Sequence, residues 1–224
     1  MVMRVVSVNV GRPRDIVWGK KVVRTAIFKE PVAGRSWLRR SNLEGDGQAD
    51  LSVHGGLEKA VYAYPVENYD YWREQLPGQE LPLGIFGENL TLAGLTEDAV
   101  YIGDELRIGT ARLVVTQPRL PCYKLGIRFG DPAIVARFLA GQRPGFYLSV
   151  QEEGEIGAGD PVEWIHERRN KLTVVALFRL MTNKKTNMKL LKRTLRAGQL
   201  ASTFRAKIGG WLLRRPYLAW IAGR

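Results

Sequence analysis

The hydrophobic positions of the first 166 residues recur in short runs that predict β-strands. Each run is rich in Val, Ile, Leu or Tyr, and Gly, Asp or Pro separates it from the next. The strand-like segments are residues 2–11, 22–28, 59–66, 88–92, 99–110, 111–118 and 145–165. Two similar turns, Gly103-Asp104 and Gly159-Asp160, are typical of corners in a closed β structure. The pattern predicts a mostly β fold, closed into a barrel.

Helical patterns are few within this part of the chain. One spans Glu67 to Gln75, and another spans Pro132 to Ala140, where Asp131 suits the cap position. The aromatic residues around the first helix are interpreted as core rather than as a ligand platform. They are Tyr62, Tyr64, Tyr69, Tyr71 and Trp72.

After Ile165 the spacing of the apolar residues changes to that of helices, with cations between them. The helical segments are residues 173–182, 187–197 and 200–213. We therefore predict two units: a β-barrel domain over residues 1–166 and a basic three-helix extension over residues 167–224.

The net charge of +12 belongs to this extension. Residues 167–224 contain fifteen Lys and Arg and one acid, whereas residues 1–166 contain nineteen basic and twenty-one acidic residues. Such a tail suits nucleic acid, an anionic membrane surface, an acidic protein partner or simply a solvated helical face. Its aromatic residues are better interpreted as a small core than as a nucleic-acid surface, so nucleic acid is the less favoured partner.

A single cysteine excludes a disulfide scaffold and suits a reducing compartment. The apolar N-terminal run is too short for a signal peptide, and no segment approaches the ~20 apolar residues of a membrane span. We expect a soluble, cytoplasmic protein.

That cysteine, Cys122, lies in the segment QPRLPCYKLG, where Pro118 and Pro121 restrict the backbone. Arg119 and Lys124 are cations that would favour a reactive thiolate. The alternative is that Cys122 is a small buried hydrophobic residue, as free cysteine usually is.

A second polar segment, residues 45–72, contains His54, then Gly55-Gly56 and Lys59. Two successive glycines allow close approach of the backbone and leave amides available to an anion. Asp46, Gln48 and Asp50 precede the histidine at alternating positions. The ordinary alternatives are a turn histidine satisfied by a carboxylate and a solvated lysine.

In a third segment, GIFGENLTL, Glu88 and Asn89 stand at the start of a predicted strand. Glu88 is a candidate proton donor or orienting residue, and its alternative is a turn carboxylate. Asn89 could equally form an Asx-turn.

Several chemistries fit these residues. Zinc is disfavoured because the chain has two histidines and no CxxC or HExxH spacing, and no phosphate-binding nucleotide motif is present. Cys122, His54 and either Asp50 or Glu88 could form a hydrolase triad. Alternatively, one thiolate could ligate a thiophilic metal that carries further ligands of its own, with cations holding a phosphate.

The segments DLSVHGGLEKAVYAYPVENYDYW, GIFGENLT and GDELRIGTARLVVTQPRLPCYKL, followed by the basic tail, closely resemble MOSC-domain proteins of the YiiM type. These proteins are relatives of the C-terminal domain of molybdenum-cofactor sulfurase. The VHGG…KAVYAY, FGENL and PRxPCxKL blocks occur in the family's order, and the resemblance covers nearly the whole chain.

This resemblance implies a molybdenum cofactor, with Cys122 as the thiolate ligand to molybdenum. It also implies reduction of N-hydroxylated compounds, including purine bases such as 6-hydroxylaminopurine, and hence detoxification of base analogues. On this hypothesis His54 or Glu88 supplies protons. Lys59, Asn89, Arg119 and the Gly55-Gly56 amides hold the cofactor.

No flavin fingerprint or cysteine set for an iron–sulfur cluster is present in the sequence, so an external reductase, a flavoprotein, is expected as the electron donor. The basic tail is a candidate docking surface for it, and a homodimer is an open alternative. The competing interpretation of the whole chain is a carrier of the cofactor or of sulfur that turns over no substrate.

Overall fold

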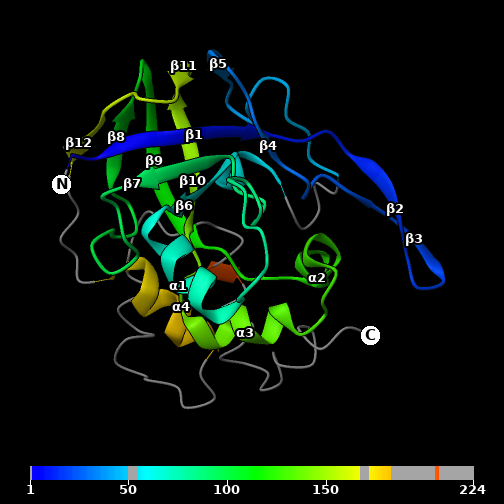
Figure 1. Ribbon diagram of the computed structural model, residues 1–224. Coiled ribbons are helices and arrows are strands. Elements are labelled where there is room, and N and C mark those ends of the chain that lie inside the picture. Colours follow the sequence, from blue (N-terminus) through cyan, green and yellow to red (C-terminus); the bar gives the residue numbers. More distant parts are fainter. Residues whose placement is uncertain (1, 50–54, 167–171, 183–204, 207–224) are drawn as a thin grey trace.

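The computed structural model describes residues 2–49, 55–166, 172–182 and 205–206. Its main feature is an eight-stranded sheet in the order β12-β8-β9-β10-β6-β7-β1-β4 (Figure 1). Neighbouring strands are antiparallel except for β6 and β7, which are parallel. The strands are β1 (Arg4–Val10), β4 (Glu30–Pro31), β6 (Val61–Pro65), β7 (Leu90–Ala93), β8 (Glu105–Ile108), β9 (Ala111–Pro118), β10 (Phe146–Glu152) and β12 (Val162–His166).

Two smaller sheets complete the β structure. One pairs β5 (Arg35–Leu38) with β11 (Gly154–Gly157), and the other is a hairpin of β2 (Arg14–Trp18) and β3 (Lys21–Thr25). Every segment predicted as strand contains one, but β2, β4 and β5 were not predicted. The mostly β fold is therefore confirmed.

The predicted closure into a barrel is wrong for the sheet that the structure describes. No continuous ladder joins its two ends within the described residues. Instead, β1 meets the segment before β12 through an isolated bridge between Arg4 and Pro161 and through backbone hydrogen bonds such as Val5 N to Asp160 O, at 2.9 Å. Pro161 has no N–H to donate, which explains why a regular ladder does not continue through this position.

The two Gly-Asp turns have the same local geometry, as their sequences predict. Gly103 and Gly159 both have a φ of 92°, a conformation that favours glycine. In each turn the aspartate accepts a hydrogen bond from the amide three residues earlier: Tyr101 N to Asp104 at 2.7 Å, and Gly157 N to Asp160 at 2.9 Å. The carboxylate thus satisfies a backbone donor that the reversal leaves exposed.

The helices gather on one side of the sheet (Figure 1). They are α1 (Glu67–Gln75), α2 (Tyr123–Phe129), α3 (Ile134–Gly141) and α4 (Val174–Thr182), with a short 3₁₀ turn η1 (Leu57–Lys59). The predictions of α1, α3 and α4 are confirmed, whereas α2 was predicted as a loop. The two further helices expected in the tail lie almost entirely outside the described residues, and the division of the chain at residue 166 stays a prediction.

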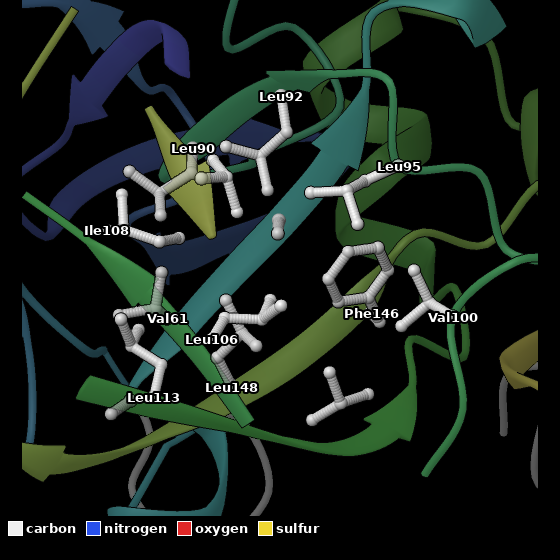
Figure 2. Packing of buried hydrophobic residues seen from close by; sticks show 14 of the residues in the cluster. Val61, Leu90, Leu92, Leu95, Val100, Leu106, Ile108, Leu113, Phe146 and Leu148 are labelled. Atoms are coloured by element: carbon white, nitrogen blue, oxygen red, sulfur yellow. The ribbon is translucent and has the colours of Figure 1, made fainter. Parts of the chain in front are cut away.

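Two clusters of buried side chains form the interior. The first lies within the sheet and is mainly aliphatic; Figure 2 shows Val61, Leu90, Leu113 and Phe146 among its members. Residues of α4, including Leu177, pack in this same cluster.

The second cluster is aromatic and lies between α1, α2, α3 and the loop before β7. Trp72, Tyr64, Tyr69, Phe86 and Phe138 are all fully buried in it. The indole N–H of Trp72 donates to the Tyr64 hydroxyl at 2.7 Å. The interpretation of Tyr64, Tyr69 and Trp72 as core is confirmed, whereas Tyr71 is half-buried and Tyr62, although buried, also lines the pocket described below.

Among the described residues, no helix has the length and apolar character required to cross a membrane.

Candidate functional site

A pocket lies where the segment after β3, the Asp46 loop and the Cys122 segment meet. Four of the predicted site residues line it: Lys59, Asn89, Arg119 and Cys122. Lining residues that the sequence did not single out as ligands include Lys29, Asp46, Tyr62 and Tyr147. The pocket therefore brings one thiol together with several cations and two aromatic rings.

Cys122 is the residue immediately before α2 and has an extended backbone, with φ −125° and ψ 172°. Its side chain is half-buried and forms no disulfide. Pro118 and Pro121 precede it and are buried. The thiol is thus held at the junction between a rigid segment and a helix, on the wall of a pocket.

Arg119 is a buried cation, with only 6% of its surface exposed. Its guanidinium lies 4.9 Å from the ring centre of Tyr62 and 5.4 Å from that of Phe138. Burial lowers the pKa of Arg119, but the side chains of Tyr62, Tyr147 and Cys122 outweigh this effect and raise it. Its Nη1 atom is buried and has no hydrogen-bond partner. Such an orphan donor suits an anionic or carbonyl oxygen of a ligand.

Lys29 and Asp46, which also line the pocket, form a buried ion pair with side chains 7% and 3% exposed. Asp46 Oδ1 also accepts the Gly11 amide at 2.8 Å, and its Oδ2 accepts Asn89 Nδ2 at 2.9 Å. Burial lowers the pKa of Lys29, and the charge of Asp46 opposes that effect. The pair contributes two mutually satisfied charges to the pocket.

Asn89 joins three parts of the site. Its Oδ1 accepts the Tyr62 amide at 3.1 Å, and its Nδ2 donates to Asp46 and to Asn9 O. The side chain thereby ties β6, β1 and the Asp46 loop together at the floor of the pocket. These bonds occupy the amide, so it acts as a structural link within the lining.

Glu88 is fully buried and is absent from the pocket lining, although its neighbours Gly87 and Asn89 line it. Its Oε1 accepts hydrogen bonds from the Tyr69 hydroxyl, from Gly84 N at 3.0 Å and from Thr91 Oγ1 at 3.1 Å. Oε2 is buried without a partner. Burial raises the pKa of Glu88, and these hydrogen bonds only partly oppose it.

The glycines Gly55 and Gly56 are not among the residues that line the pocket. Gly56 has a φ of 90°, precedes η1 and donates its amide to Gln48 at 3.2 Å. Lys59, at the end of η1, does reach the lining. His54 and Asp50 lie outside the described residues, so their predicted roles stay predictions.

The participation of Lys29 and Tyr147 had no signal in the sequence. Lys29 follows a predicted strand and belongs to no motif, and Tyr147 lies within another predicted strand. Tyr147 reaches the site because β10 pairs with both β6 and β9. Asp46 was noted only for its alternation with Gln48 and Asp50.

Comparison with known proteins shows the family of the chain. The MOSC domain model matches residues 50–163, which include Asn89, Arg119 and Cys122. The chain belongs to the MOSC-domain family. This domain is of the kind found at the C-terminus of molybdenum-cofactor sulfurase, which points to an association with that cofactor.

Curated MOSC relatives span much of the chain. The uncharacterized protein YflK of Bacillus subtilis is 40% identical over 202 residues, covering 90% of this chain and 91% of YflK. Protein YiiM of Escherichia coli is 43% identical over 143 residues, covering 63% of this chain and 64% of YiiM. A protein named "Reductase" from Gibberella moniliformis is 30% identical over 188 residues; the match covers 83% of this chain and 33% of that longer protein.

Solved MOSC structures share the fold. YiiM from Geobacillus stearothermophilus has a TM-score of 0.79 at 32% identity, covering 94% of this chain and 99% of its own. YiiM from Escherichia coli has a TM-score of 0.75 at 30% identity, covering 95% of this chain and 93% of its own. The chain is therefore a MOSC protein of the YiiM type.

Proposed function

We propose that this MOSC protein is a molybdenum-cofactor-dependent reductase of N-hydroxylated compounds, with 6-hydroxylaminopurine as a representative substrate. The observation that carries the proposal is the pairing, in one pocket, of the thiol of Cys122 with the buried, unpartnered donor of Arg119. The family's link to the cofactor and the name of the Gibberella relative support it.

The residues present fit such a cofactor. In the described part of the chain, no cluster of three His, Cys, Asp or Glu side chains could hold a bare metal ion. A metal at Cys122 would therefore have to bring most of its ligands with it, as the molybdenum of a pterin dithiolene does. A thiolate suits such a thiophilic metal, and Arg119 suits an anionic oxygen.

The overall reaction is a two-electron reduction: R–NHOH, two electrons and two protons give R–NH₂ and water. The bound cofactor would supply the electrons that break the N–O bond. Cys122 would ligate the metal, while Arg119 and Lys59 would hold the phosphate of the pterin. Asn89 would keep the floor of the pocket in place through its bonds to Asp46 and Tyr62.

We propose that either His54 or Glu88 donates the proton. Glu88 faces Tyr69 rather than the pocket, so a direct transfer from it would need a side-chain rearrangement. Its raised pKa favours the protonated form that a donor requires. His54 is the other candidate, and replacing each residue by glutamine would separate them.

Molybdenum and pterin content of protein purified anaerobically from a cofactor-producing host tests this function. Wild type should carry about one molybdenum per chain. Cys122→Ser should carry little, because a neutral hydroxyl is a poor ligand for a thiophilic metal. Tyr123→Ala is the matched control, since Tyr123 is adjacent and 52% exposed but does not line the pocket.

Turnover then separates the proposal from its alternatives. Reduction of 6-hydroxylaminopurine by the loaded wild type, with reduced methyl viologen as donor, supports the reductase. Loading without turnover of any N-hydroxylated compound would favour a cofactor or sulfur carrier. Metal-free wild type from a competent host would overturn both and favour a thiol hydrolase.

A further inference from the structure

The hairpin of β2 and β3 extends from the body as an arm (Figure 1). Its strands pair with each other through Asp15–Arg24, Ile16–Val23 and Val17–Val22, and with no other strand of the described chain. The arm therefore presents a small two-stranded sheet that has an inward and an outward face.

The outward face is apolar at its centre. Val17 and Val22, which are directly paired, are 75% and 68% exposed. On the inward face Val23 and Thr25 are buried, at 9% and 1%. The two valines therefore form a small exposed apolar patch on this face.

Cations lie at the tip and the base of the hairpin rather than beside the two valines. Lys20 is in the turn, Arg12 precedes β2, and Lys21 pairs with Trp18, which puts it on the opposite face from Val17 and Val22. Residues 12–24 contain five basic residues and one acid, a net charge of +4. Arg12, Lys20 and Lys21 are exposed and form no ion pair in the described part of the chain. Asp15, the one acid, is paired with Arg24 at 3.1 Å. The arm therefore suits an acidic surface that has an apolar centre.

The arm is also joined directly to the pocket. Thr25, the last residue of β3, and the following Ala26 and Ile27 line it. At the base, Arg14 lies 3.9 Å from the ring centre of Phe28, and Arg128 of α2 lies 5.0 Å from the same ring. The same helix α2 begins directly after Cys122. The base of the arm therefore adjoins the Cys122 pocket.

We propose that the β2–β3 hairpin, through the cations at its tip and the exposed Val17 and Val22, docks the acidic electron-transfer protein that supplies the reductase. This inference rests on the proposed function and names its partner surface. The donor is oxidised by two electrons for each N–O bond broken, and solvent ultimately supplies two protons, one to the hydroxyl that leaves as water and one to the amine nitrogen. Short-lived redox encounters use small interfaces, which suits a contact limited to this hairpin.

Other occupants fit less well. A second copy of this chain would bring two arms of charge +4 together, and their repulsion opposes a symmetric contact. Nucleic acid would use the cations but not the two central valines. Among the described surfaces, charge and apolar centre together favour an acidic protein.

The test measures 6-hydroxylaminopurine reduction by the loaded full-length protein with two kinds of donor. One is dithionite-reduced methyl viologen, a small molecule that needs no docking surface. The other is a reduced acidic protein, either a flavodoxin or a [2Fe–2S] ferredoxin. The variant is Lys20→Glu with Lys21→Glu. Its matched control is Arg4→Glu with Arg107→Glu, which reverses two exposed strand cations near the opposite end of the molecule.

For at least one protein donor, the Lys20/Lys21 variant should raise KM about ten-fold at low ionic strength, with little effect at high salt. Viologen-driven turnover should stay within about two-fold of wild type, since the variant leaves the pocket intact. The Arg4/Arg107 control should resemble wild type with both donors.

Three results would overturn the docking surface while leaving the reductase intact. They are equal KM changes in variant and control, viologen turnover without turnover from either protein donor, or a wild-type dimer that the hairpin variant dissociates. Absence of turnover even with viologen in the metal-loaded protein would instead refute the proposed function.

Discussion

Asp46→Asn breaks a charge pair that the fold has removed from water. Asp46 and Lys29 are 3% and 7% exposed, so the variant leaves the lysine charge buried without its counter-ion. The new amide also disrupts a hydrogen bond with Asn89. Asp46 Oδ2 accepts from Asn89 Nδ2, whereas an NH₂ group in that position would oppose one donor with another.

The expected loss is large on the scale of a folded domain. Breaking a buried pair by removing one partner costs about 3–5 kcal/mol, out of a total stability of roughly 5–15 kcal/mol. In a chain of this size, each kcal/mol corresponds to a Tm shift of about 2–4 °C, so Tm should fall by about 10 °C.

Urea unfolding followed by far-UV circular dichroism measures the effect, and the hairpin supplies the control. Asp15→Asn breaks a pair whose side chains are 56% and 62% exposed, so it should cost only about 0.2–1 kcal/mol. Adding Lys29→Met to Asp46→Asn should recover most of the lost stability by removing the unpaired charge. Equal losses for Asp46→Asn and Asp15→Asn would refute the reasoning.

The pH dependence of Asp46→Asn has a defined sign. Burial lowers the pKa of Lys29 below its value in the unfolded chain, and the variant removes the charge that opposes this. The unfolded state then binds more protons, so stability rises with pH. The deficit relative to wild type should therefore shrink as the pH approaches the ordinary lysine pKa of 10.5.

Two further predictions concern other buried positions. Because burial raises the pKa of Glu88, folded wild type binds more protons than the unfolded chain. The stability of wild type relative to Glu88→Gln should therefore fall as pH rises above 4.5. Urea unfolding at a series of pH values measures this difference in stability, and a difference that does not change with pH would contradict the prediction. Gly145→Ala would place Cβ 2.5 Å from Ala63 O, whereas the Cβ of Gly78→Ala would meet nothing within 4 Å. Both glycines have a positive φ, so each variant should lose ~1–2 kcal/mol of stability through backbone strain. Only Gly145→Ala should lose more than this, and thermal unfolding of both variants measures the difference.

The elements that the sequence predicted are those whose signal is local. The helix over Glu67–Gln75 was predicted with its observed bounds, and β9 was predicted as residues 111–118. In α2 the local signals conflict with the structure, since Gly126 lies in its interior and two prolines precede it. A Cβ at Gly126 would lie 3.2 Å from Pro132 Cα, so close packing against the next segment requires glycine there.

The site residues also divide into those that local sequence signals predicted and those that depend on tertiary packing. Cys122, Arg119, Lys59 and Asn89 stand in recognisable sequence blocks, and the structure brings all of them to one pocket. Glu88 stands in such a block too, yet its side chain turns to Tyr69 because successive side chains at the strand entrance point to opposite faces. Only the three-dimensional packing could distinguish it from Asn89.

The sequence by itself determined most of the strand and helix segments, the Gly-Asp turns and the identity of the thiol, because each depends on neighbouring residues or on a distinctive block. The tertiary structure alone decided how the sheet ends, which charges are buried together, and where the hairpin lies. Lys29 and Asp46 are 17 positions apart in the chain, and Tyr62 and Tyr147 come from different strands. Their proximity follows from strand register and loop packing, which no local pattern of residues encodes.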